Sequence, residues 1–271
     1  MLRLYILSLL ACCLTVSALP TPFASWFRAA RWHAPSSTSY LEFVKRVPQA
    51  VSGSCDLSQA SIPTGKPEST MPLSMPISDR CLAPTPLPPP SSGLSLSHVA
   101  VGRGTQNYTC DLTNATAVPV AIGALASLYN VSCIAADMPA LLAYIPGIAL
   151  DMPIPSSPDS SSPVNEDLSG FHYFLNSTTP FFNLDTSLHS YGNGAFKKAN
   201  QTTAPTTAMK GPNGQGDGAV AWLKLSAMSP GGQVFQEVYR VNTAGGNPPK
   251  TCTGMAASFE VPYSAEYWLY T

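Results

Sequence analysis

The chain has 271 residues, which is enough for one sizeable β-domain or two small ones. Its 14 basic and 15 acidic side chains nearly balance, and only 11% of its residues are charged. Nucleic-acid-binding proteins usually carry a basic patch, whereas the only adjacent basic pairs here are Lys45-Arg46 and Lys197-Lys198, so nucleic acid is excluded as a partner.

Residues 1–18 have the pattern of a cleavable secretion signal. Arg3 precedes an apolar run from Leu4 to Val16, and Val16 and Ala18 occupy the minus-three and minus-one positions of an A-x-A-like cleavage site. The run is shorter than the roughly 20 residues that a membrane-spanning helix needs. We therefore expect a secreted, extracellular protein with no membrane partner.

Two further segments precede the predicted domain. Residues 19–50 are interpreted either as a pro-segment cut at the dibasic pair Lys45-Arg46 or as an N-terminal arm that packs through its aromatic residues. Residues 51–93 contain closely spaced prolines, which cannot continue a helix or a strand ladder. This second segment is predicted to be an extended Pro/Ser-rich linker.

The predicted domain spans residues 94–271 and begins with a strand. Apolar residues alternate from Leu94 and resume one residue out of phase at Val99. This pattern indicates a half-buried strand with a β-bulge near His98.

One short helix is predicted in the middle of the domain. Asp137-Met138-Pro139 opens an apolar stretch that runs to Tyr144, as expected for a helix with proline in its first turn. Residues 151–167 are rich in Pro, Ser and Asp without periodicity, which predicts a surface insertion.

The C-terminal part of the domain has the clearest strand pattern. Alternating runs predict strands over residues 219–226, 233–241, 256–261 and 266–270. Ser229-Pro230-Gly231-Gly232 separates two of them and is typical of a hairpin turn. Several short strands punctuated by glycine and proline predict an all-β fold, an antiparallel β-sandwich or barrel with one short helix and long Pro/Ser-rich loops.

Five of the seven cysteines remain once the signal has been removed. They are Cys55, Cys81, Cys110, Cys133 and Cys252. In an oxidising compartment this odd number predicts two disulfides and a spare thiol, for which Cys81 is the candidate because it lies in the Pro/Ser-rich segment. The other four cysteines allow three pairings, and their wide spacing argues against a zinc site.

Five asparagines lie in N-x-S/T sequons. They are Asn107, Asn114, Asn130, Asn176 and Asn200. In a secreted eukaryotic protein several of them are expected to carry glycans and to face solvent. Asn107 is the best candidate for an unmodified site, because it adjoins Tyr108 and Cys110 in a predicted strand.

Two glycine-rich stretches are candidates for phosphate-binding loops, and neither fits. Gly102-Arg103-Gly104 lacks the third glycine of a dinucleotide fingerprint, since Asn107 occupies that position, and no helical pattern follows. Residues 211–218 lack the Lys-Ser/Thr pair of a P-loop and lead into a strand. We therefore expect no cofactor.

His172 and Asp217 are weak candidates for catalytic residues. His172 stands among Phe171, Tyr173 and Phe174, and an imidazole in an apolar cleft can act as a base, although a packed and hydrogen-bonded histidine is more common. Asp217 could act as a carboxylate base but is also a standard turn residue. The four histidines show no metal-ligand spacing, so no metal site is expected.

The strand predicted over residues 233–241 carries two charged residues, Glu237 and Arg240, on opposite faces. They cannot act together from that strand, and each is expected to pair across the sheet. Aromatic residues of the domain could line a sugar-binding platform, although they more often fill β cores. These are Tyr108, Trp222, Tyr239, Tyr263, Tyr267, Trp268 and Tyr270.

Five motifs, taken in order, resemble the secreted family known as DUF3455, a domain of unknown function found in fungi and bacteria. They are Gly102-Arg-Gly-Thr-Gln-Asn-Tyr-Thr-Cys110, Gly170-Phe-His-Tyr173, Asp217-Gly-Ala-Val-Ala-Trp-Leu-Lys-Leu225, Val238-Tyr-Arg-Val-Asn-Thr-Ala-Gly-Gly246 and Val261-Pro-Tyr-Ser-Ala-Glu-Tyr267. The resemblance covers about Leu94 to Thr271 and supplies no catalytic or binding residues.

The resemblance has two implications. Bacterial relatives keep cysteines that match Cys110 and Cys252, so these two are implied to pair, which leaves Cys55 with Cys133. Some fungal relatives carry a malate dehydrogenase label. That label requires a dinucleotide-binding βαβ unit, whereas this chain is predicted to be β-rich and secreted and lacks the glycine fingerprint.

The function expected from the sequence is that of a secreted glycoprotein that binds an extracellular ligand, such as carbohydrate or another cell-wall component. The alternative is a secreted hydrolase that uses His172 and Asp217, which requires both groups to meet in one pocket. The residues do not decide whether the protein is an enzyme.

Overall fold

The computed structural model describes residues 55–64, 83–154, 167–187 and 189–271. Eight strands within these residues form a closed barrel, in which every neighbouring pair is antiparallel. In chain order they are β1 (Leu96–Thr109), β2 (Val120–Asn130), β3 (Leu168–Asn176), β4 (Thr179–Asp185), β5 (Ser190–Thr202), β6 (Trp222–Ala227), β7 (Glu237–Gly245) and β8 (Ser258–Tyr270). The predicted all-β antiparallel fold is confirmed, and the sheet closes because β1 pairs with both β2 and β8.

Several sequence-based predictions concern residues that lie outside the described part of the chain. These are the signal at residues 1–18, the segment 19–50 with its Lys45-Arg46 pair, the thiol of Cys81 and most of the predicted insertion over residues 151–167. They stay predictions.

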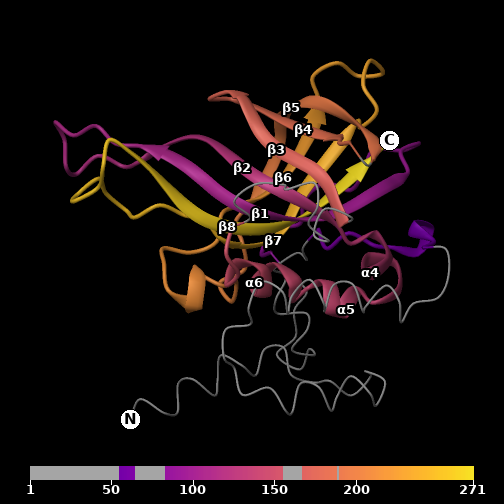
Figure 1. The fold of residues 1–271 in the computed structure, drawn as a ribbon, viewed down its shortest axis with the longest axis horizontal. Helices are drawn as coiled ribbons and strands as arrows, with labels where there is room; N and C mark the ends of the chain where they lie inside the picture. Colours follow the sequence, from indigo (N-terminus) through magenta and orange to yellow (C-terminus); the bar gives the residue numbers. More distant parts are fainter. Residues whose placement is uncertain (1–54, 65–82, 155–166, 188) are drawn as a thin grey trace, which may run out of the picture.

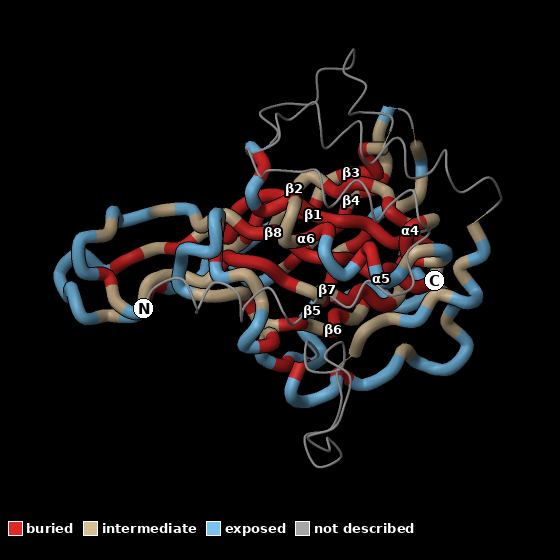
Figure 2. Tube along the Cα trace, turned by 90° about the horizontal axis from the view of Figure 1, so that it is seen from below, coloured by how far each residue is buried: buried red, intermediate tan, exposed pale blue. Residues whose placement is uncertain are grey.

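Side chains alternate between the interior of the barrel and its outer surface, as the period of two in a strand requires. One core cluster fills the interior, and its largest members are Tyr263, Tyr267, Phe182, Phe196 and Phe235. In Figure 2, where buried residues are red, the longest buried runs follow β1 and β8. The interior is therefore packed with apolar and aromatic side chains.

Three short helices follow β2 and cover one side of the barrel (Figure 1). They are α4 (Ser132–Asp137), α5 (Pro139–Leu142) and α6 (Ile145–Leu150), and they contact the strands β1, β7 and β8. The helix predicted before Tyr144 is present as α5, with Pro139 in its first turn, where the missing N–H costs nothing. Its N-cap is Met138 rather than Asp137.

A second core cluster lies between these helices and the outer surface of the barrel. It joins Ile134, Leu142 and Ile145 of the helical segment to outward-facing residues such as Tyr239 and Trp268. All five side chains are at most 2% exposed. The helices therefore bury the outward side chains of the strands on which they pack.

The Pro-rich segment before the barrel packs against the same side. Ala83 and Leu87 are buried in the outer core cluster, and the Pro88 carbonyl accepts a hydrogen bond of 2.9 Å from the Tyr239 hydroxyl. Residues 83–91 contain no helix or strand, as predicted for a proline-rich stretch. This part of the segment is fixed to the domain rather than hanging free of it.

A buried ion pair fixes the end of the same segment. Lys224 Nζ lies 3.0 Å from Glu237 Oε1 and donates to the Pro89 carbonyl at 2.8 Å. Glu237 also accepts hydrogen bonds from the backbone N–H and the hydroxyl of Ser91. The prediction that Glu237 pairs across the sheet is confirmed, because Lys224 lies on β6 and Glu237 on β7.

The strand predictions for the C-terminal part need one correction. β6 and β7 form the predicted hairpin, and a register shift between Leu96 and His98 confirms the bulge in β1. The separate strands predicted over residues 256–261 and 266–270 are one strand, β8. Pro262 does not interrupt it, because it lies one residue beyond the last β7–β8 pair, Gly245 with Tyr263.

The Gly102-Arg103-Gly104 stretch lies inside β1 and not at the start of a helix. A Cβ at residue 102 would collide with the Tyr267 ring, and one at residue 104 would collide with the backbone of Leu125, so both glycines serve close packing. Arg103 points outward and donates to the Met152 carbonyl, which holds the segment after α6 against the barrel.

Candidate functional site

His172 is buried inside the barrel, at 3% exposure, on β3. Its ring stacks on Phe182, with ring centroids 4.3 Å apart, and its Nδ1 lies 3.0 Å from the Phe181 carbonyl oxygen. Burial lowers the pKa of His172 to about 4, against the smaller raising effect of the Phe181 carbonyl. The imidazole is therefore neutral at pH 7.

Asp217 is exposed in the glycine-rich loop between β5 and β6. Phe174, Phe182 and Tyr267 surround the His172 ring, so the side chain of His172 is packed among aromatic rings rather than open to solvent. Among the described residues, the structure shows no hydrogen bond or ion pair between His172 and Asp217. The two candidate catalytic residues are not brought together.

A second buried histidine was not singled out as a functional residue by the sequence. His98 Nε2 lies 2.7 Å from Ser169 Oγ, and its ring packs on Tyr191. Burial, and to a smaller extent the nearby His189, lower the pKa of His98 to about 4. His98 is 3% exposed and Ser169 is fully buried, so this pair is a core hydrogen bond and not an accessible nucleophile and base.

The aromatic residues considered as a sugar platform are all core residues. Tyr108, Trp222, Tyr239, Tyr263, Tyr267, Trp268 and Tyr270 are each at most 6% exposed. The reading of these residues as core rather than platform is confirmed.

A different group of aromatic residues faces outward from β3 and β4. Tyr173 and Phe181 pair directly across these strands, with ring centroids 5.3 Å apart. They point away from His172 and Phe182, their neighbours in sequence, which lie in the interior. Both rings are half-buried.

The row continues onto the neighbouring strands. Phe181 pairs with Ala195 of β5, and on the other side Leu125 of β2 is 54% exposed. Leu175, the next outward residue of β3, is 55% exposed. An apolar row with two aromatic rings therefore crosses the outer surface of β2–β5.

A parallel row beside it is mostly polar. Phe171 pairs with Ser127 on one side and with Asn183 on the other, and Asn183 pairs with Asn193. This row brings a third aromatic ring, a hydroxyl and two amides to the same face. We call the two rows together, Leu125, Tyr173, Phe181 and Ala195 with Ser127, Phe171, Asn183 and Asn193, the aromatic–amide face.

Asp185 lies at the edge of the aromatic–amide face, and three hydrogen-bond donors hold its carboxylate in place. It accepts hydrogen bonds from Asn193 Nδ2 at 2.7 Å, from the Gly192 backbone N–H at 2.8 Å and from the Ser190 hydroxyl at 3.0 Å. The Asn193 amide and then the Gly192 N–H lower the pKa of Asp185. The carboxylate is therefore ionised at neutral pH.

The sequence could not have identified the aromatic–amide face from its pattern. Residues 170–175 are apolar or aromatic at almost every position, so the period of two does not show which side of β3 is inside. The pairing of Tyr173 with Phe181 also depends on register, which the turn between the two strands sets.

Three of the five sequon asparagines are exposed: Asn114, Asn176 and Asn200. Asn114 Oδ1 accepts hydrogen bonds from the backbone N–H and the hydroxyl of Thr116, and Asn176 accepts the same pair from Thr178. In both cases the amide nitrogen is left at the surface.

The other two sequon asparagines are half-buried. Asn107 accepts a hydrogen bond from the Thr105 hydroxyl inside β1, and Asn130 accepts one from the Ser132 backbone N–H at the start of α4. Ser132 Oγ lies 3.1 Å from the backbone nitrogen of Val99, from which it accepts a hydrogen bond. These two sites are less accessible than the other three.

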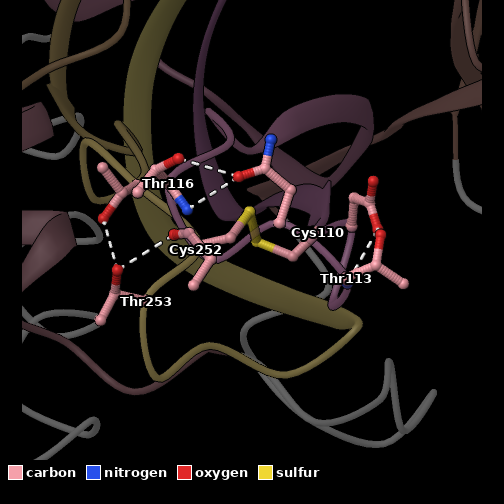
Figure 3. Close-up of a disulfide and its surroundings, with 9 residues drawn as sticks. Cys110, Thr113, Thr116, Cys252 and Thr253 are labelled. Atoms are coloured by element: carbon pink, nitrogen blue, oxygen red, sulfur yellow. Dashed lines mark hydrogen bonds between the residues drawn. A yellow bond between two sulfur atoms is a disulfide. The ribbon is translucent and has the colours of Figure 1, made fainter.

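The structure contains two disulfides, Cys110–Cys252 and Cys55–Cys133, which are the pairs implied by the family resemblance. Cys110 directly follows β1, and Cys252 precedes β8, where the two strands extend beyond the rest of the barrel (Figure 1). Thr253 donates to the Ala115 carbonyl beside this bond (Figure 3). The disulfide therefore ties two distant parts of the chain together at the tip of the barrel.

The described residues contain neither a cluster of metal-binding side chains nor a membrane-spanning helix. No cluster of three or more His, Cys, Asp or Glu side chains is placed to hold a metal ion within that part of the chain. None of its helices has the length and apolar character needed to cross a membrane.

Residues 90–271 match the model of a family described as a protein of unknown function, DUF3455. The match covers more than half of the chain, so the protein belongs to this family. No curated protein and no solved structure matches the chain. The family assignment made from the five motifs is confirmed, and it brings no reaction or ligand with it.

Proposed function

We propose that the protein is an extracellular glycoprotein that binds cell-wall polysaccharide through the aromatic–amide face, without cleaving it. The observation that carries this proposal is the outward pairing of Tyr173 with Phe181, beside a row that contains Asn183 and Asn193. Aromatic faces stack on the apolar faces of sugar rings, and neighbouring amides and carboxylates bind sugar hydroxyls. A sheet face offers both in a nearly flat array.

The extracellular location is supported by three independent features. The chain begins with a signal-like pattern, the described part contains two disulfides, and three of the five sequon asparagines are exposed. Disulfides persist in oxidising compartments and are rare in the cytosol. A bond such as Cys110–Cys252 fits secretion better than cytosolic residence.

Two catalytic functions have less support. Hydrolysis by His172 and Asp217 would need the histidine to reach a substrate, whereas His172 is 3% exposed and packed on Phe182. The malate dehydrogenase label requires parallel strands joined by helices around a glycine fingerprint, whereas the eight described strands pair antiparallel with their neighbours. Neither activity is proposed.

Depletion from solution by insoluble polysaccharide tests the proposal. The secreted protein is mixed with cellulose, chitin or β-1,3-glucan, and the fraction left in the supernatant is measured. We expect the wild type to bind at least one polymer, and the double variant Tyr173→Ala/Phe181→Ala to bind it more weakly by roughly tenfold or more, because stacking contributes about 1 kcal/mol per ring.

The matched control is Tyr144→Ala, which removes an exposed tyrosine from the helix-covered side. This variant should bind like the wild type. Wild-type protein that stays in the supernatant with all three polymers, or a double variant that binds as tightly as the control, would contradict the proposal.

A further inference from the structure

A half-buried arginine, Arg240, points into the barrel, where the described strands place no counter-charge. Arg240 of β7 pairs with Tyr267, whose ring is in the interior core, and therefore points inward. Its Nε and Nη2 donate to the Ala221 carbonyl at 3.3 and 2.9 Å. A carbonyl oxygen accepts hydrogen bonds but carries no full charge, so the positive charge of Arg240 is not neutralised by this contact.

The acidic residues of the described strands all point the other way. Glu237 lies three positions from Arg240 on the same strand and pairs with Lys224 on the outer surface. Glu260 and Glu266 lie an even number of positions from Trp268 on β8, so they point outward as Trp268 does. Asp185 also faces outward, on β4. No strand position that points into the barrel is an aspartate or a glutamate within the described residues.

Gln106 supplies a second unsatisfied donor in the interior. Its side chain is 7% exposed, and its Nε2 atom is buried with no hydrogen-bond partner. The side chain lies against Gly246, because a Cβ at that residue would come within 3.1 Å of Gln106 Cγ and 2.9 Å of Tyr263 Cβ. Buried amide groups are almost always hydrogen-bonded, and the Tyr263 hydroxyl, which lies beside this amide, is already hydrogen-bonded to Tyr267, so Nε2 can still bind an added acceptor.

Two tyrosine hydroxyls connect Gln106 with Arg240. Tyr263 Oη and Tyr267 Oη are 2.9 Å apart and fully buried. Burial raises the pKa of Tyr263 well above its ordinary value, whereas Arg240 and the Gln106 amide act to lower it, which places both groups close to this hydroxyl. Burial raises the pKa of Tyr267 as well, so both phenols stay protonated at neutral pH, and because one hydroxyl donates to the other, one phenol proton remains as a donor.

We propose that this part of the barrel interior binds a small carboxylate, with Arg240 supplying the positive charge and Gln106 Nε2 a hydrogen-bond donor. Donors from an arginine, an amide and one phenol converge there, since the other phenol proton is used in the Tyr263–Tyr267 hydrogen bond, and a carboxylate is acceptor-only with two oxygens. The site is separate from the aromatic–amide face, so it does not depend on the proposed polysaccharide binding.

Thermal unfolding of the full secreted protein in sodium formate, acetate or propionate tests this proposal, with sodium chloride at equal ionic strength as the reference. A ligand that binds only the folded state raises Tm with its concentration. We expect at least one carboxylate to raise Tm with a saturating dependence that chloride does not reproduce. Arg240→Gln should abolish the increase, and Lys197→Gln, at an exposed position of β5, should keep it.

The variant Gln106→Glu keeps the proposal testable if Arg240→Gln fails to fold. In this variant the side chain of residue 106 itself supplies a carboxylate beside Arg240. The variant should therefore have a higher Tm than the wild type without added anion and should no longer respond to acetate. The proposal is overturned if all three carboxylates act as chloride does, which is the result expected if water alone satisfies Gln106. It is also overturned if Gln106→Glu lowers Tm and still responds to acetate.

Discussion

Outward-facing aromatic side chains are fully covered on one side of the barrel and only partly covered on the other. On β7 and β8, Tyr239 and Trp268 point outward and are at most 1% exposed, because the helices and the Pro-rich segment cover them. On β3 and β4, Tyr173 and Phe181 also point outward but stay half-buried. Packing alone thus explains the outward aromatic residues on β7 and β8, whereas those on β3 and β4 are the rings on which the proposed binding depends.

The largest expected effect is the loss of a covered ring. Trp268→Ala removes a buried side chain from the outer core and leaves Glu266 without the Trp268 indole donor. This change should lower the free energy of unfolding by about 3–5 kcal/mol. Phe181→Ala, on the other side, should cost about 1 kcal/mol, because its ring is only half-buried. Urea denaturation measures both, and equal losses would show that the two sides do not differ.

Acid should destabilise the barrel through its two buried histidines. The folded-state pKa values of His98 and His172 are lowered to about 4, so the unfolded chain binds more protons than the folded chain between pH 6.5 and 4. Stability should therefore fall as the pH falls through that range, by about 2–3 kcal/mol for each histidine.

Glu266, on the helix-covered side, works in the opposite direction. Burial raises its pKa to about 7, so between about pH 4.5 and 7 the folded chain holds a proton that the unfolded chain has released. The stability that this proton contributes is lost as the pH rises through that range. Two histidines outweigh one carboxyl below pH 6, which places the maximum of stability near neutral pH. Denaturant titrations from pH 4 to 8 check this, and His172→Gln should flatten the acid side of the curve; an unchanged slope in that variant would refute the assignment.

The ion pair that holds the Pro-rich segment should contribute less than the core rings. Glu237→Gln breaks the contact with Lys224 and weakens the hydrogen bonds to Ser91, at a cost of about 1–3 kcal/mol in the free energy of unfolding. The double variant Lys224→Met/Glu237→Leu leaves no buried charge unpaired and should cost less than Glu237→Gln. A double variant that is the less stable of the two would contradict this account.

Glycan placement should have the smallest effect on stability, below about 0.5 kcal/mol. We expect glycans on Asn114, Asn176 and Asn200, which are exposed, and none on the half-buried Asn107 and Asn130. Enzymatic deglycosylation in heavy-oxygen water, followed by peptide mass spectrometry, marks each occupied asparagine as a labelled aspartate. A fully occupied Asn130 would show that the start of α4 opens before folding is complete.

Alternation and turn chemistry predicted some of the elements that have one buried and one polar face, but not β4 or β5, although burial alternates strictly along β4. The hairpin between β6 and β7, the bulge near His98 and the helix that starts at Pro139 all followed from local pattern. β2 was not assigned as a strand, because its small and apolar residues show no clear period over residues 118–129. Local pattern cannot identify a strand that is apolar on both faces.

The candidate sites depend on information that the sequence pattern does not contain. Because Glu237 and Arg240 are three positions apart on one strand, the sequence predicts that they lie on opposite faces of the sheet. Only the closed barrel shows that Arg240 is the one that points inside. The pairing of Tyr173 with Phe181 likewise depends on strand register and on which side of the barrel the helices cover. Both sites are products of tertiary arrangement rather than of motifs.

Hydrogen–deuterium exchange with and without a soluble oligosaccharide of the bound polymer tests the central claim most directly. The proposed binding face predicts increased protection in β3 and β4, around Tyr173 and Phe181, with the exchange of α4–α6 unchanged. Protection confined to the helix-covered side, or no change anywhere under saturating oligosaccharide, would contradict it.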